Sequence, residues 1–194
     1  MELRRTDLDA DPLRQFRKWC DEATDVVRAR EAMAVATANA DGAPSVRMVR
    51  LKAADERGLV FFTHYTSRKG RELEVNPHAA LLFHWDPLGR QVRVEGAVER
   101  VSPEESDAYF ATRPAGARAG AWASRQSAVL GDRAELERRA AELAEADLKR
   151  PETWGGFRVV PEAWEFWQHR DDRLHDRFRY ARHDGAWVIE RLYP

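Results

Sequence analysis

The chain has 194 residues, of which 43% are hydrophobic and 10% are aromatic, and 32 lysines and arginines stand against 33 aspartates and glutamates. This length suits one large domain, and the hydrophobic fraction excludes a chain that is disordered throughout. The formal net charge of −1 argues against a generally basic nucleic-acid binder but is compatible with local basic pockets.

The cysteine content and the N-terminus favour a reducing compartment. Cys20 is the only cysteine, which excludes a disulfide framework and a Cys-rich zinc site. The N-terminal segment is charged from its second residue and has no apolar signal core. Apolar runs such as Ala79–Phe83 are much shorter than the roughly 20 residues that span a bilayer. We therefore expect a cytoplasmic protein that does not enter a membrane.

The first predicted element is a helix that begins at Asp11-Pro12, with the aspartate as N-cap and the proline at the first helical position. Its apolar residues recur at helical spacing, and Cys20 lies among them as a predicted buried structural thiol. From Ala32 onward the pattern changes to strands, predicted over residues 32–38, 45–52 and 59–63. A short helix capped by Ser67 follows and ends near residues 76–77.

The second half continues with strands over residues 79–85 and 91–99, of which the latter alternates most clearly. A capping-box pattern at Ser102 predicts a helix through Phe110, and a charged, alanine-rich helix with a solvated face is predicted over 133–147. Strands over 155–160 and 163–168 precede a hairpin formed by 178–182 and 187–192. The fold class is mainly β with peripheral helices (α+β), arranged as a barrel.

Several common catalytic motifs are absent. The sequence has no dinucleotide-binding or P-loop glycine motif, no nucleophile elbow and no H-E-x-x-H helix. Its six histidines form no pair with metal-ligand spacing, so no metal site is expected. His64, His78 and His84 are predicted at the surface or at strand edges. Four tryptophans are assigned to packing in the core or at an interface: Trp85, Trp122, Trp154 and Trp187.

Cations gather on strands and at a helix start. Arg50 and Lys52 share one face of a predicted strand and Arg47 lies on the other, so at least one face meets solvent or an anion. Arg68 and Lys69 oppose the dipole at the start of the following helix, which a bound phosphate would explain. An ordinary exposed basic turn is the alternative for this segment.

The third cluster is the segment 167–177, where a dense run of Arg, His and Asp follows an apolar strand end that contains Trp167. By itself this segment fits a solvated loop with surface ion pairs. Together, the three clusters indicate a small planar ligand that carries a phosphate and is held by Arg and Lys beside Trp.

With these motifs in view, the chain resembles the pyridoxine/pyridoxamine 5′-phosphate oxidase family, flavoproteins with a split β-barrel fold. The matching stretches occur in the family's order: RMVRLK (47–52), FFTHYTSRKGRELEVNP (61–77), LLFHWDPLGRQVRVEG (81–96), YFATRP (109–114), GAWASRQS (120–127), WGGFRV (154–159), EFWQ (165–168), RLHDR (173–177) and RLYP (191–194). The resemblance implies an N-terminal arm and helix over residues 1–30 and a single split-barrel FMN-binding domain with inserted helices over 31–194.

The resemblance also implies a homodimer with two FMN sites at the subunit interface, each built from both chains. Carried over by motif position, the FMN-binding residues are Arg47, Met48, Val49, Leu51, Lys52, Phe62, Thr63, Arg68, Lys69, Gln91, Gln126, Ser127, Trp167 and Arg177.

For the substrate, the resemblance implies a second phosphate clamp and a cover over the pyridine ring. The substrate-binding residues are Lys52, Tyr109, Arg113, Arg173, Leu174 and His175, of which Arg173 and His175 are the catalytic candidates. The implied reaction transfers a hydride from pyridoxine or pyridoxamine 5′-phosphate to FMN and yields pyridoxal 5′-phosphate, after which dioxygen takes the electrons and becomes hydrogen peroxide.

Four departures from the family pattern affect the substrate assignment. The chain begins just before the DPL motif and lacks the additional arm, with Arg and Tyr near the substrate, that precedes it in a typical member. Ala117 stands where a serine hydroxyl often contacts the substrate phosphate, and we expected that Arg118 could compensate for it. Arg50 replaces a usual leucine, and the stretch 133–154 is short.

Two alternatives to this activity follow from the departures. One is a relative that oxidises a different small ring, as in phenazine pathways, at the same FMN site. The other is a non-catalytic binder of FMN or pyridoxal phosphate, which the presence of both Arg173 and His175 disfavours.

Overall fold

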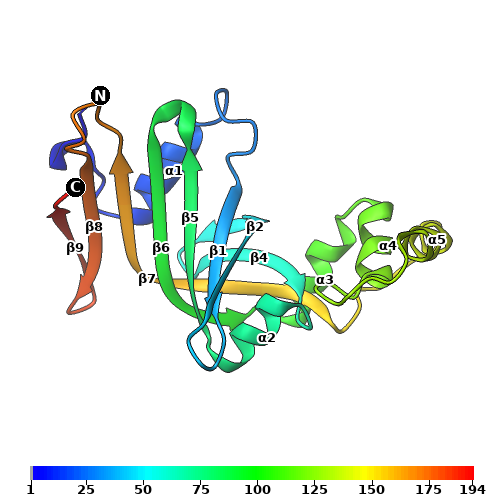
Figure 1. Cartoon of the computed structure of the whole chain (residues 1–194). Coiled ribbons are helices and arrows are strands. Elements are labelled where there is room, and N and C mark those ends of the chain that lie inside the picture. The colour runs from blue at the N-terminus through cyan, green and yellow to red at the C-terminus, as the bar shows by residue number, and fades with distance from the viewer. Residues whose placement is uncertain (1) are drawn as a thin grey trace.

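The computed structural model describes residues 2–194 (Figure 1). Its strands form one nine-stranded sheet with the path β2-β1-β5-β6-β7-β4-β3, and β8 extends the sheet from β7 to β9. The strands are β1 (Ala32–Ala38), β2 (Pro44–Arg50), β3 (Ala53–Asp55), β4 (Gly58–His64), β5 (His78–Trp85), β6 (Arg90–Arg100), β7 (Trp154–Gln168), β8 (Asp176–His183) and β9 (Ala186–Leu192).

The longest strand, β7, joins two parts of the sheet. Its first half pairs with β4 and its second half with β8, while β6 runs beside both halves. A register shift at Glu95/Gly96 lets the two long strands bend together, and a Cβ on Gly96 would lie 2.0 Å from the carbonyl oxygen of Val160. In Figure 1, the first half of β7 runs across the view below β4, and the strand then turns upright between β6 and β8.

The main core lies between the sheet and helix α1 (Pro12–Glu22). Asp11 accepts a hydrogen bond from the backbone N–H of Leu13 and Pro12 occupies the first turn, as predicted. Phe16 and Trp19 are nearly fully buried, and Trp19 packs edge-on against Phe166 of β7.

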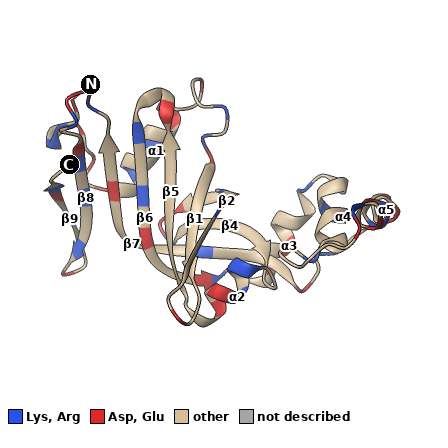
Figure 2. Cartoon of the chain, viewed as in Figure 1, with Lys and Arg blue, Asp and Glu red and all other residues tan. Residues whose placement is uncertain are grey.

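The remaining helices lie elsewhere around the sheet. Helix α2 (Arg68–Val75) starts at the predicted N-cap Ser67, whose hydroxyl accepts from the N–H of Gly70. Helices α3 (Pro103–Ala111), α4 (Ala115–Ala123) and α5 (Arg133–Leu143) project to one side of the barrel in Figure 1. Short 3-10 helices lie at Arg5–Asp7 and Asp86–Leu88. Figure 2 shows both signs of charge spread over the barrel and along α5.

The α+β barrel is confirmed, with differences in detail. The strands predicted over 155–160 and 163–168 are one continuous strand, because Pro161 lies where the register shifts and its missing N–H interrupts no ladder. Helix α4 and strand β3 were not predicted, and α5 ends at Leu143 rather than at Asp147. No helix within residues 2–194 is long and apolar enough to cross a membrane.

Candidate functional site

A cavity of about 760 Å³ opens where β2, β4 and the α3–α4 region meet. Its lining residues are Arg50, Lys52, Phe62, Thr63, His64, Tyr109, Thr112, Arg113, Pro114, Ala117, Gly120, Ala121, Ser124, Gln126 and Trp154. The walls contain three cations and neither an aspartate nor a glutamate. The cavity therefore favours an anionic ligand.

Stacked aromatic rings form one wall of this cavity. Phe62 stacks on Tyr109 at 4.1 Å and on Trp154 at 5.4 Å between ring centroids. The guanidinium of Arg113 lies 4.6 Å from the Trp154 ring, and Lys52 Nζ lies 5.7 Å from the Tyr109 ring. Burial lowers the pKa of Arg113, and its Nη1 is buried without a hydrogen-bond partner within residues 2–194. Such an orphaned donor fits a site that is completed by an anion.

Lys69 lies behind the cavity wall and is only 6% exposed. Its Nζ donates to Thr63 Oγ1 at 2.9 Å and to Gln126 Oε1 at 3.0 Å, both neutral acceptors. Burial, together with the nearby charge of Arg47, lowers the pKa of Lys69 to about 8. A buried ammonium without a carboxylate at hydrogen-bond distance fits a phosphate ligand.

The start of α2 is held by the loop that follows α4. The backbone N–H of Arg68 donates to Ser127 Oγ at 3.1 Å, and Ser127 has a left-handed backbone with φ 73°. A non-glycine residue in this region is strained and persists where its surroundings enforce it. The contact therefore brings Ser127 and Gln126 to the helix start that carries Arg68 and Lys69.

Glu72 is a buried residue beside the predicted cofactor-binding arginines, and the sequence analysis did not single it out. It is 5% exposed and accepts hydrogen bonds from Thr37 Oγ1, from Ser45 Oγ at 2.6 Å and from Arg68 Nε at 2.9 Å, and it lies 3.3 Å from Arg47 Nη2. Burial alone would raise the pKa of Glu72, but the hydrogen bonds from Ser45, Thr37 and Arg68 and the charge of Arg47 lower it to about 2. Glu72 thus fixes two of the predicted cofactor-binding arginines. Its only sequence signal is the i,i+4 spacing from Arg68.

His64 corrects a sequence expectation. The residue is 6% exposed and lines the cavity, instead of lying at the surface or at a strand edge. Burial, Lys69 and Arg113 all lower the pKa of His64, which favours the neutral ring. The strand pattern missed it because β4 is buried on both faces around this position.

A second group of predicted residues lies at the far end of β7. Trp167 is paired in register with Gln91 on β6 and with Arg177 on β8. Arg177 donates to Glu165 Oε1 at 2.8 Å and to the carbonyl oxygen of Tyr193 at 2.9 Å. These contacts fix the Arg177 guanidinium next to the C-terminus of the chain.

The two catalytic candidates belong to this second group. The ring of His175 lies 4.7 Å from the Trp167 ring, and His175 Nδ1 accepts from the backbone N–H of Arg170 at 3.1 Å. Arg173 has a left-handed backbone with φ 65°, and the side chain of Leu174 beside it is 63% exposed. The segment thus presents Arg173 and Leu174 outward from a fixed His175.

The two groups are widely separated within one chain. Gly155 pairs with Thr63 at one end of β7 and Trp167 lies twelve residues farther along, which corresponds to about 40 Å of extended strand. The structure brings together Lys52, Phe62, Thr63, Arg68, Lys69, Tyr109, Arg113, Gln126 and Ser127, with Arg47 behind them. It does not bring Gln91, Trp167, Arg173, Leu174, His175 or Arg177 to them.

The other predicted residues lie on or directly after strand β2 or are the tryptophans that were assigned to packing. Val49 and Leu51 pack against the core, whereas Met48 is 65% exposed on the outer face of β2. Trp85 and Trp187 pack in or against the core as predicted, while Trp122 is 43% exposed. Trp154 is both buried and part of the cavity wall, which the assignment to packing alone did not foresee.

The expected compensation for Ala117 by Arg118 is not supported. Ala117, Gly120, Ala121 and Ser124 form the helical face of α4 that lines the cavity, and Arg118 does not belong to it. Arg118 instead donates weakly to the carbonyl oxygen of Ala111, at 3.4 Å.

Comparison with known proteins decides the family. Residues 20–146 match the family model described as pyridoxamine 5′-phosphate oxidase, and residues 154–194 match the pyridoxine 5′-phosphate oxidase C-terminal dimerisation region. The chain belongs to the pyridoxamine 5′-phosphate oxidase family. It is therefore an enzyme of an oxidoreductase family, and it carries that family's dimerisation region.

Curated relatives are similar in sequence over nearly the whole chain. A pyridoxine/pyridoxamine 5′-phosphate oxidase of Ralstonia pickettii is 57% identical over 97% of this chain and 91% of its own length. The homologue of Rubrobacter xylanophilus with the same name is 56% identical over 96% of this chain and 88% of its own length.

Solved structures confirm the fold. PhzG from Burkholderia lata, determined in complex with tetrahydrophenazine-1-carboxylic acid, superimposes with a TM-score of 0.94 at 36% identity, covering 100% of this chain and 98% of the other. A pyridoxamine 5′-phosphate oxidase-related FMN-binding protein from Nostoc punctiforme has a TM-score of 0.78 at 16% identity, covering 96% and 100%. The split barrel of this family is thus the fold of the chain.

Proposed function

We propose that the chain catalyses the FMN-dependent oxidation of pyridoxine 5′-phosphate or pyridoxamine 5′-phosphate to pyridoxal 5′-phosphate. The observation that carries the proposal is the cavity with three cations, no carboxylate and a wall of stacked rings. Cations match a phosphate, and flat rings match a pyridine or a flavin. The curated relatives with more than half of their residues identical support the same activity.

The residues around α2 fit the phosphate of FMN. Lys69 supplies a buried ammonium whose hydrogen-bond acceptors within residues 2–194 are neutral oxygens, and the N-terminus of α2 favours an anion. Arg47 and Arg68 are fixed by Glu72, so little side-chain entropy remains to be lost on binding. When bound, FMN would accept the hydride and pass the electrons to dioxygen. The protein's own part is to bind, orient and shield the reactants.

Lys52, Tyr109 and Arg113 are the proposed contacts to the substrate phosphate. Arg113 offers a buried Nη1 without a partner within residues 2–194, and its guanidinium is held flat against Trp154. The N–H of Lys52 donates to the carbonyl oxygen of Val60 at 2.8 Å, which fixes this residue beside β4. Two cations from different elements can then hold one phosphate from two sides.

A second copy of the chain completes the proposed site. Within one chain Arg173, Leu174 and His175 lie at the opposite end of β7 from the cavity, and they belong to the dimerisation region matched over residues 154–194. In a two-fold symmetric dimer each copy would bring its 173–177 segment, with Gln91 and Trp167, to the cavity of the other. The two sites of such a homodimer are equivalent.

The contacts of His175 define what its ring can do. Because Nδ1 accepts from the N–H of Arg170, the neutral ring carries its proton on Nε2. His175 would therefore present an N–H donor to a substrate hydroxyl or ring oxygen, while Arg173 would cover the pyridine ring with a planar cation.

A second candidate function is supported by the likeness to PhzG. The TM-score of 0.94 and the complex of that protein with tetrahydrophenazine-1-carboxylic acid support a non-phosphorylated ring substrate as this second candidate. Ala117 favours this alternative, because it removes a hydroxyl from the cavity wall. The pair of Lys52 and Arg113 favours the doubly charged phosphate instead.

Anaerobic mixing of the FMN-loaded protein with pyridoxine 5′-phosphate tests the proposal, with the visible flavin absorbance as readout. Bleaching that air reverses, with release of hydrogen peroxide, is the expected result. A yellow protein that stays oxidised with both the pyridoxine and the pyridoxamine phosphates would contradict the proposed substrate. Protein that takes up no FMN would contradict the proposed cofactor as well.

A further inference from the structure

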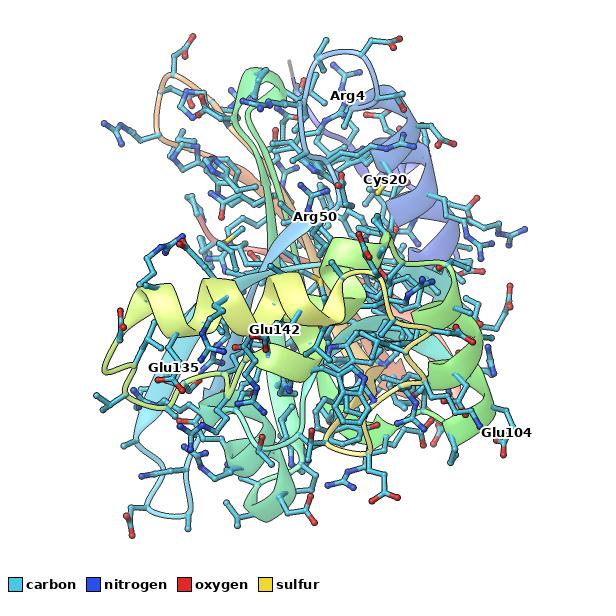
Figure 3. All side chains as sticks on the ribbon, turned by 90° about the vertical axis from the view of Figure 1, so that its right-hand side faces the viewer. Arg4, Cys20, Arg50, Glu104, Glu135 and Glu142 are labelled. Carbon is cyan, nitrogen blue, oxygen red and sulfur yellow. The ribbon has the colours of Figure 1, made fainter. Side chains whose placement is uncertain are left out.

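Arg50 lines the cavity but was not among the predicted site residues. It is the last residue of β2, paired in register with Ala32 at the start of β1, and Figure 3 labels it in a view from the side of α4 and α5. Lys52 follows two residues later. Side chains two positions apart on an extended chain point to the same side, about 7 Å apart, which is within reach of an arginine side chain.

The charges of the cavity wall differ in how they are neutralised. Within residues 2–194, Lys52 and Arg113 form no ion pair, whereas Arg50 Nη1 lies 2.9 Å from Glu31 Oε1. A guanidinium has five N–H donors, and this carboxylate engages Nη1 alone. The Arg50 side chain is 64% exposed and Arg50 lines the cavity, so Glu31 leaves other N–H donors of the guanidinium open to solvent.

The α4 side of the cavity lacks a hydroxyl at position 117, although Ser124 at the end of the helix carries one. Ala117 on α4 faces the cavity with a methyl group, and Arg118 does not line the cavity. A phosphate held by Lys52 and Arg113 would meet a methyl group at position 117, and Arg50 is the third cation among the lining residues.

We propose that Arg50 is a further substrate-binding residue, which adds a third cation to the phosphate site of Lys52 and Arg113. The inference rests on the proposed function, because it takes the phosphate of a vitamin B6 vitamer as the ligand. Arg50 would turn its free N–H donors to the phosphate while Glu31 keeps hold of Nη1. The Glu31 pair would then limit how much positive charge the site offers.

The test compares Arg50→Leu and Arg50→Lys with a matched control, in FMN-loaded protein. Arg138→Leu is the control, because Arg138 is 65% exposed and paired with Glu142 at 2.8 Å on α5, away from the cavity lining. The readouts are KM and kcat for pyridoxine 5′-phosphate, equilibrium binding of pyridoxal 5′-phosphate and of unphosphorylated pyridoxal, and FMN retention.

Arg50→Leu should raise KM and weaken pyridoxal 5′-phosphate binding about three- to tenfold, a range that allows for solvent screening of this exposed cation. Binding of pyridoxal, FMN retention and kcat should stay unchanged, and Arg50→Lys should restore most of the affinity. An unchanged KM in Arg50→Leu, or equal losses for pyridoxal and its phosphate, would overturn the inference. If the wild-type protein does not turn over the substrate at all, the proposed function fails instead.

Glu31→Gln provides a second variant that leaves Arg50 in place. Removal of the carboxylate that neutralises Arg50 should tighten pyridoxal 5′-phosphate binding about two- to threefold, as expected for one charge near an exposed site. Weaker or unchanged binding in this variant would contradict a role of Arg50 at the phosphate.

Discussion

The two groups of predicted site residues are built in different ways. Around α2, Arg47, Arg68 and Lys69 are held by partners of the same chain, with the buried Glu72 between the two arginines. At the far end of β7, Arg177 and His175 are held as well, but Arg173 and Leu174 between Arg170 and His175 are exposed.

This difference indicates which residues prepare cofactor binding and which would contact the substrate ring. Binding of a phosphate-bearing cofactor can be prepared within one chain, because the cations and their partners lie on adjacent strands and one helix. In the proposed dimer, contact with the reacting ring would depend on residues that reach the cavity of the other copy. The following predictions test this comparison.

The largest expected effect comes from variants that disable one group each. Arg113→Ala and Arg173→Ala should each lower kcat/KM about 100-fold through lost positioning of the substrate. When the two inactive variants are mixed under conditions of subunit exchange, half of the dimers are hybrids with one unaltered site. Activity should then recover to about a quarter of the wild-type value.

The control is a mixture of Arg113→Ala with the double variant that carries both substitutions, which contains no unaltered site. No recovery in the first mixture would show that each site is built within one chain, and recovery in the control would show that the regained activity does not come from shared sites.

The second effect concerns the group around α2. Glu72→Ala removes the carboxylate from between Arg47 and Arg68 and should lower the free energy of unfolding by about 3 kcal/mol, with weaker FMN retention. The stability of Glu72→Gln should lie between those of the wild type and Glu72→Ala, because the glutamine amide oxygen still accepts from Ser45. Urea denaturation and dialysis of bound FMN provide the two measurements.

Glu74→Ala is the matched control on the same helix, because Glu74 forms an exposed pair with Arg100. A loss of stability in Glu74→Ala as large as in Glu72→Ala would argue against a special role of the buried carboxylate.

The smallest effect is a pH dependence of cofactor binding. Since burial lowers the pKa of Lys69 to about 8, its ammonium is lost as the pH rises through this value, and FMN affinity should fall about three- to tenfold between about pH 7 and 9. The stability of the cofactor-free protein should depend on pH in the opposite direction. The unfolded chain binds more protons than the folded one between the two Lys69 pKa values, so stability rises with pH there.

FMN affinity measured against pH in the wild type and in Lys69→Arg distinguishes deprotonation of Lys69 from titration of another group, because an arginine stays charged throughout this range. An equally steep pH dependence in both proteins would assign the effect to another group.

Much of the fold could be predicted from the sequence because its signals are local. The Asp11-Pro12 and Ser67 caps set helix starts within one turn, and alternation in β6 revealed its buried face. The continuity of β7 through Pro161 could not be predicted, since it depends on the register shift against β6. Helix α4 has no capping side chain, which explains why it was missed.

The site was predictable in composition but not in arrangement. The resemblance supplied the residue types, yet only the structure separates them into two groups along β7. The buried positions of His64 and Glu72 and the place of Arg50 in the cavity wall depend on contacts between distant segments. No pattern within a single segment contains this information.

The single strand β7 also has a consequence for how such a protein can change over generations. Gly155 pairs with Thr63 beside the cavity of one chain, and Trp167 belongs to the segment proposed to reach the cavity of the other chain. The length of β7 therefore fixes the distance between the two half-sites. Point substitutions leave its length intact. One inserted or deleted residue, however, turns every later side chain to the opposite face. Spacing along β7 is therefore inherited as a whole, while the residues at its ends are free to diverge toward new ring substrates.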